Sequence, residues 1–77
     1  MTIDGAAFSP ADLTVKSGDT IVWVNKDLLA HTATATSGAF NSNVIQPGQS
    51  WRYVAKTKGD FPYTCAFHPM TGRVTVR

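Results

Sequence analysis

The sequence contains one cysteine, two histidines and no glutamate among its 77 residues. A single cysteine cannot form an internal disulfide, and it excludes four-cysteine zinc or iron–sulfur sites and the Cys-x-x-Cys redox motif. No apolar run approaches the roughly 18 residues that a membrane-spanning helix needs. The net charge is only +2, and no basic run is interleaved with aromatic residues, so we expect no nucleic-acid partner.

The N-terminus also lacks a signal peptide, because Met1 to Gly5 has neither a basic start nor an apolar stretch. We therefore expect either a cytosolic protein or a chain from which an export segment is absent. The composition is that of a globular protein, with 43% hydrophobic and 16% charged residues. The length suits a single domain over residues 1–77, which is small enough for a bound metal to add stability.

Short strand-like runs separated by turn residues make up most of the chain. Residues 20–25 give the strongest strand signal, because they are rich in β-branched and aromatic side chains. The other predicted strands are residues 13–16, 31–36, 50–54, 61–65 and 72–76, and residues 37–44 are left as a loop, a short strand or one helical turn. This spacing predicts an all-β fold, an antiparallel β-sandwich.

The donor atoms for a metal are concentrated near the C-terminus. Cys65, His68 and Met70 lie within six residues, and thiolate, imidazole and thioether together suit copper. Electron-transfer copper is held by two histidines and one cysteine in a trigonal arrangement, with a weak axial methionine. The second imidazole must come from His31, the only other histidine.

Local geometry permits these side chains to converge. Pro69 fixes its own φ and favours an extended His68, and alternate residues of an extended segment point the same way. His68 and Met70 are therefore expected to face whatever Cys65 binds. His31 begins a predicted strand, so it should lie at one end of the sandwich. The aspartates lie mainly beside turns, and we interpret them as solvated side chains.

These motifs make the chain resemble a small blue copper protein of the cupredoxin family, in its amicyanin and plastocyanin branch. The resemblance runs from Phe8-Ser9-Pro10 through residues 18–25 to His31, and resumes from Pro47-Gly48 to the Cys65, His68 and Met70 cluster and residues 72–76. It implies a shortened Greek-key β-sandwich. It also implies one type 1 copper ion held by His31, Cys65, His68 and Met70. One departure is that only Pro69 separates His68 from Met70, where the shortest familiar loops have two residues.

The resemblance further implies a one-electron carrier that is not an enzyme, is monomeric, and works in the periplasm or another extracytoplasmic compartment. A redox protein would dock transiently near His68, on an apolar patch formed by Leu28, Leu29, Ala30, Phe67 and Pro69. In place of the family's usual Asn after the upstream histidine stands Thr32, whose backbone N–H remains available to the thiolate.

Two other functions stay open at this point. The same ligands could deliver or sequester copper, with Cu(I) as cargo, or the chain could be an electron-transfer module of a larger oxidase or reductase. A metal-free adhesion module is disfavoured by the complete ligand set. A hydrolytic Cys–His enzyme is disfavoured because nothing around Cys65 resembles an acyl-transfer site.

Overall fold

The computed structural model describes residues 1–77 and contains eight strands. They are β1 (Thr2–Asp4), β2 (Ala7–Ser9), β3 (Asp12–Val15), β4 (Thr20–Asn25), β5 (Thr34–Ala35), β6 (Ser50–Val54), β7 (Gly59–Thr64) and β8 (Thr71–Val76). None of the chain forms a helix with the length and apolarity needed to cross a membrane.

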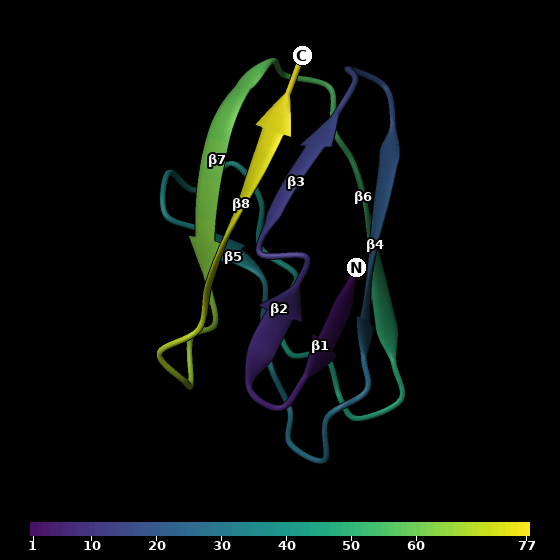
Figure 1. Ribbon diagram of the computed structural model, residues 1–77, viewed down its shortest axis with the longest axis vertical. Coiled ribbons are helices and arrows are strands. Elements are labelled where there is room, and N and C mark those ends of the chain that lie inside the picture. Colours follow the sequence, from purple (N-terminus) through teal and green to yellow (C-terminus); the bar gives the residue numbers. More distant parts are fainter.

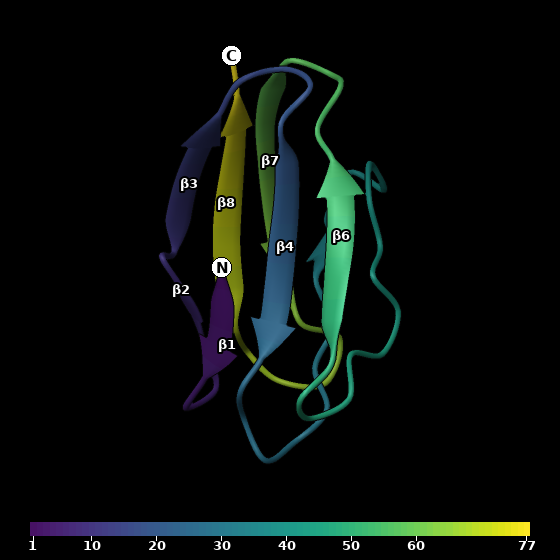
Figure 2. The same cartoon turned by 90° about the vertical axis from the view of Figure 1, so that its right-hand side faces the viewer.

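The strands form two sheets that face each other (Figures 1 and 2). One sheet has the order β2-β1-β4-β6 and the other the order β3-β8-β7-β5, so the predicted all-β sandwich is confirmed. Four of the strand pairs are antiparallel, and two are parallel: β1 with β4, and β3 with β8. The chain changes sheet between β2 and β3, so the N-terminal strands lie in both sheets, beside strands from distant parts of the sequence.

The two sheets share one apolar core of fourteen buried residues. Trp23 of β4 and Tyr63 of β7 are both fully buried, and they meet across the sandwich with their rings edge to face, 5.5 Å between centroids. The Trp23 Nε1–H donates to the Tyr63 hydroxyl at 3.3 Å, so the polar atoms of both rings are paired inside the core. This contact joins the two sheets at β7, the strand that leads to Cys65.

Two features of the N-terminal half differ from the predictions. A hairpin of β1 and β2 was not predicted; its turn is made by Gly5 and Ala6, both with positive φ, as a two-residue type I′ turn requires. The strand predicted over residues 31–36 is reduced to β5. His31 forms only an isolated bridge with Ile45, and the N–H groups of Thr32 and Ala33 donate to side chains, not to a neighbouring strand.

The segment 37–44 is a loop, as one of the predicted alternatives had it. Its Phe40 is buried and packs 5.6 Å from Trp23, between ring centroids. Ser42 accepts the Ala33 N–H at 2.8 Å. The loop therefore closes the open side of the core and supports the backbone that follows His31.

Candidate metal centre

The loop between β7 and β8 carries three of the four predicted ligands. It lies at the lower end of the molecule in Figure 1. The Cys65 N–H donates to the Met70 carbonyl at 3.2 Å, which closes the base of the loop. Inside it, the Met70 N–H donates to the His68 carbonyl at 2.7 Å, a γ-turn with Pro69 at its centre. The loop is therefore bent at Pro69 where the sequence predicted an extended segment.

His31 reaches the same end of the sandwich from the connection that follows β4. Its backbone N–H and C=O both pair with Ile45, at 3.1 and 2.7 Å, and its side chain is fully buried. The expected convergence of the upstream histidine with the C-terminal loop is thus observed.

Three donor atoms face one another here, within 4.8 Å. Cys65 Sγ lies 3.6 Å from His31 Nδ1 and 3.9 Å from His68 Nδ1. A metal ion at the centre of a trigonal plane, with bonds of about 2.1 Å to nitrogen and about 2.3 Å to sulfur, needs a sulfur–nitrogen separation of about 3.8 Å. The two observed separations fit a single ion, and the donor set of one thiolate and two imidazoles suits copper. His31, Cys65 and His68 form a candidate copper site.

The environment of Cys65 favours its thiolate. Burial by itself raises the pKa of the thiol, but the N–H groups of Thr32 and Phe67 and the two imidazoles outweigh it and lower the pKa to about 6. The Thr32 nitrogen lies 3.4 Å from the sulfur, a contact that replacement of the family's usual Asn by Thr left available. Because the thiolate is the form that binds a metal, the protein prepares this ligand by its own hydrogen bonds.

The structure adds a residue that the sequence analysis missed. Asp27 is not a freely solvated side chain, since its Oδ2 lies 2.8 Å from Nε2 of His31. The carboxylate also accepts hydrogen bonds from the N–H groups of Ala6 and Leu28. The pKa of Asp27 is lowered, first by its hydrogen bond with His31 and then by these two backbone hydrogen bonds. Its position four residues before the first histidine was the only signal in the sequence.

Burial and hydrogen bonding shift the pKa of His31 in opposite directions. Burial lowers the pKa of the imidazole, but its hydrogen bonds to Cys65 and Asp27 prevail and raise it. A carboxylate at Nε2 holds the ring with Nδ1 turned toward Cys65, and in the neutral imidazole it keeps the proton on Nε2, so that the Nδ1 lone pair is free for a metal ion. The ring is therefore oriented for ligation before any ion arrives.

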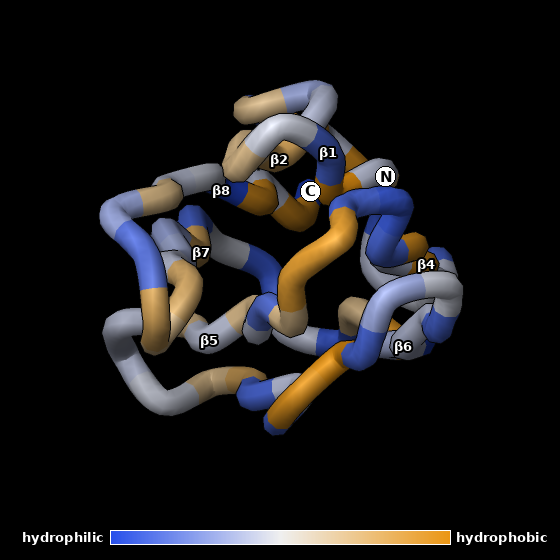
Figure 3. The backbone as a smooth tube through the Cα atoms, turned by 90° about the horizontal axis from the view of Figure 1, so that it is seen from below, coloured by the Kyte–Doolittle hydropathy of each residue, from blue (hydrophilic) through white to orange (hydrophobic).

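The remaining predicted residues occupy the same end of the molecule. Met70 is buried, with 4% of its surface exposed, and Pro69 is exposed beside the half-buried His68. Leu28, Leu29 and Phe67 are 91%, 55% and 56% exposed. Figure 3, viewed from this end, shows a hydrophobic stretch of chain that runs from β4 toward β5 across the surface.

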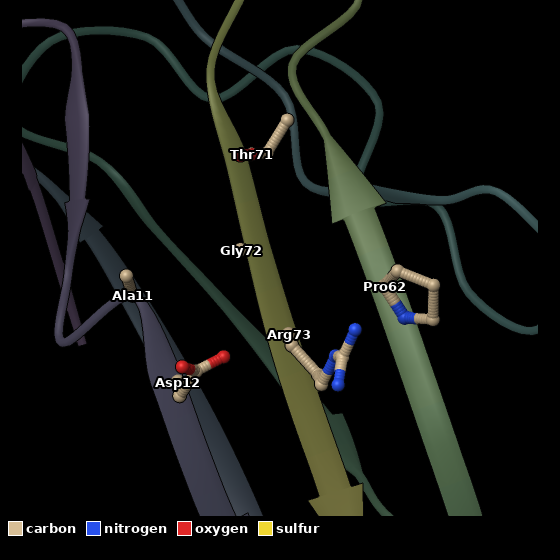
Figure 4. A pocket seen from close by; sticks show the side chains of 6 residues that line it. All are labelled: Ala11, Asp12, Pro62, Thr71, Gly72 and Arg73. Carbon is tan, nitrogen blue, oxygen red and sulfur yellow. The ribbon is translucent and has the colours of Figure 1, made fainter.

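Two shallow hollows occur elsewhere on the surface. One lies over β3, β8 and β7 (Figure 4) and is lined by Ala11, Asp12, Pro62, Thr71, Gly72 and Arg73. The other involves Lys16, Asp19 and Arg77 with two residues of β3. Neither hollow is lined by a candidate ligand.

Comparison with known proteins gives a consistent result. The chain is 28% identical to amicyanin from Paracoccus versutus and 29% identical to chloroplastic plastocyanin from Tetradesmus obliquus, over 96% and 91% of its length. It spans 61% and 58% of the length of those two relatives. Among solved structures, a purple cupredoxin from Nitrosopumilus maritimus is 31% identical, with a TM-score of 0.85 over 95% of this chain and 84% of that one.

An amicyanin variant in its oxidised state superimposes with a TM-score of 0.91, at 26% identity, over 99% of this chain and 78% of that one. The family model described as a cupredoxin-like domain matches residues 1–76. Fold, site and similarity agree, and the chain belongs to the cupredoxin-like domain family.

Proposed function

We propose that this protein is a one-electron carrier whose redox centre is a single copper ion held by His31, Cys65, His68 and Met70. The observation that carries the proposal is the convergence of one sulfur and two imidazole nitrogens within 4.8 Å in an environment that favours the thiolate. Bound copper would supply a Cu(II)/Cu(I) couple at this position. The kinship with amicyanin and plastocyanin supports the same function and an extracytoplasmic location.

The protein's own residues would keep this site rigid. His31 is held by Ile45 and Asp27, and Cys65 is held by Thr32 and by the closed base of its loop. Ligands that are fixed from two chain segments move little when the charge of a bound ion changes. This property favours repeated electron transfer and requires no substrate pocket or catalytic residue.

Met70 is proposed as the axial ligand. Its burial at the end of the γ-turn supports this role, as does its position after Pro69 in the ligand loop. Met70→Leu should leave copper bound and raise the reduction potential, because a weak sulfur donor is lost from the oxidised state. Thr71→Val, at the neighbouring exposed position, serves as the control. An unchanged spectrum and potential in Met70→Leu would show that Met70 is not axial.

The decisive experiment is addition of one equivalent of Cu(II) to the purified protein, followed by visible and EPR spectroscopy. We expect an intense thiolate-to-copper absorption with a narrow copper hyperfine splitting, and we expect Cys65→Ala to lose both. A Cys65→Ala variant that kept the colour would refute the proposal. Colourless, tight binding of Cu(I) with poor electron self-exchange would instead indicate copper delivery or sequestration.

The partner is proposed to dock on the apolar patch of Leu28, Leu29, Ala30, Phe67 and Pro69. The exposure of Leu28, Leu29 and Phe67 supports this, because Phe67 and Pro69 flank the half-buried His68 in the sequence and Leu28 to Ala30 lead directly to His31. Leu28→Ser should slow electron self-exchange between copies of the monomer without changing the copper spectrum. Val54→Ser is a matched control, because Val54 is 44% exposed and lies at the end of β6 away from the metal centre.

A further inference from the structure

Asn25 is a fully buried polar residue whose hydrogen-bonding groups are all paired. It is the last residue of β4 and has no exposed surface. Its backbone N–H donates to Gln49 at 2.9 Å, and its backbone C=O accepts from Gly48 at 2.8 Å. Burial of an amide is costly unless every donor and acceptor is satisfied, so this position depends on its specific partners.

The side-chain amide of Asn25 contacts three separate points around His31. Its Nδ2 donates to the carbonyl of Leu29 at 2.9 Å and to the carbonyl of Ile45 at 2.8 Å. Its Oδ1 accepts the N–H of Asp27 at 2.9 Å. The asparagine side chain has two N–H donors and one acceptor oxygen, and the three bonds use both donors and the oxygen.

Each of these three hydrogen bonds holds a residue that is itself linked to His31. Leu29 lies two residues before His31, and Ile45 is its backbone bridge partner, so the Ile45 carbonyl accepts from both Asn25 and His31. Asp27 holds the imidazole itself, through the 2.8 Å contact at Nε2. The segment that leads to His31, its bridge partner Ile45 and the carboxylate at its ring are therefore all hydrogen-bonded to a single amide.

We propose that Asn25 is a positioning residue for His31, which fixes the imidazole in the orientation that presents Nδ1 to the metal. The proposal assigns no ligand role to Asn25. It rests on the proposed function only where copper is concerned, since the orientation of the ring is a property of the metal-free protein as well.

The test compares Asn25→Leu with Val76→Ala in the metal-free protein. Leucine has nearly the shape of asparagine but none of its polar groups. Val76 serves as the control, because it is a buried residue at the end of β8 whose side chain has no polar group. NMR follows exchange of the His31 Nε2–H proton with water. We expect Asn25→Leu to accelerate this exchange at least tenfold, and Val76→Ala to leave the Nε2–H proton protected although it lowers stability.

A copper titration of the same proteins gives a second readout. Loss of a residue that orients a ligand typically costs about 10–100-fold in metal affinity, and we expect Asn25→Leu to fall in this range while Val76→Ala stays at the parent value. If Asn25→Leu does not fold, Asn25→Ser replaces it, because a serine hydroxyl can still accept the Asp27 N–H but cannot reach the two carbonyls. Parent-like exchange and parent-like affinity in the folded variant would overturn the proposal.

The two readouts separate this inference from the proposed function. A parent protein that fails to form the coloured copper site would refute the electron-carrier proposal, while the exchange of the Nε2–H proton would still decide the role of Asn25. Normal copper binding in the parent, with no effect of Asn25→Leu on either readout, would refute the role of Asn25 alone.

Discussion

Asp27 binds the imidazole of His31 on the side opposite Cys65. Its Oδ2 lies 2.8 Å from Nε2, while Nδ1 of the same ring lies 3.6 Å from the cysteine sulfur. A carboxylate in this position holds the proton on Nε2 and increases the basicity of the metal-binding nitrogen. Asp27 is itself held by backbone N–H groups of Ala6 and Leu28, so the β1–β2 hairpin takes part in orienting the ligand.

Replacement of Asp27 should weaken metal binding. We expect Asp27→Ala to lower the affinity for copper by about 10–100-fold, because His31 loses the partner that fixes its tautomer. Asp4→Ala is the control, since Asp4 is an exposed carboxylate for which no side-chain hydrogen bond is found. Competition with a chelator of known affinity measures the difference, and equal affinities in the two variants would contradict the prediction.

The thiol of Cys65 should ionise near neutral pH in the metal-free protein. Its pKa of about 6 lies below the ordinary value of 9.0. The ultraviolet absorbance of the thiolate should therefore rise with a midpoint near pH 6, and Cys65→Ala should show no such step. Since the folded pKa is the lower one, the stabilisation from this group is complete above the unfolded pKa and is lost as the pH falls through the folded pKa.

The side chain of Thr32 stabilises the ligand loop without controlling the thiolate. Its Oγ1 accepts the Ala66 N–H at 2.8 Å, whereas its backbone N–H contacts the Cys65 sulfur. Thr32→Val keeps the backbone contact and removes the hydrogen bond to the Ala66 N–H, at a cost of about 0.5–1.5 kcal/mol. Urea denaturation should show this loss relative to the exposed Thr14→Val. A raised pKa of Cys65 in Thr32→Val would contradict the separation of roles.

Gly72 is required by its contact with a core aromatic ring. A Cβ at this position would lie 2.5 Å from Cζ of Tyr63 and 2.6 Å from its hydroxyl oxygen. Tyr63 is fully buried and hydrogen-bonded to Trp23, so movement of its ring would disturb the core. We expect Gly72→Ala to reduce the free energy of unfolding by about 1–3 kcal/mol. The adjacent exposed Arg73→Ala is the control, and equal denaturation midpoints would refute the prediction.

Much of the fold was accessible from the sequence because the strong strands carry their own signal. The runs at 20–25 and 50–54 are rich in β-branched and aromatic residues, and both have the predicted bounds. The first two strands were missed because each has only three residues, too few for a visible alternation. The alternation from His31 to Thr36 was misleading, since backbone donors there are used by Cys65 and Ser42 instead of a sheet.

The residues of the candidate site also fall into two groups, those that the sequence identified and those that it did not. His31, Cys65 and His68 were predictable because thiolate and imidazole are rare here and have a specific chemistry. Asp27 and Asn25 were not, because aspartate and asparagine beside a turn are ordinary in any sequence. Their roles depend on bonds to His31 and to carbonyls up to twenty residues away, which only the folded chain brings together. The candidate ligands could be inferred from residue type, but the groups that contact them required the structure.

The hydrogen bond from Cys65 to the Met70 carbonyl has a consequence for how this loop can change. It joins the residue after β7 to the residue before β8, so the four residues between Cys65 and Met70 form a small loop with a fixed base. Insertions or substitutions at 66–69 need not disturb the register of the two strands behind them. The sequence and length of this loop can therefore change, by evolution or by design, and alter the surroundings of the candidate metal site while the sandwich remains the same.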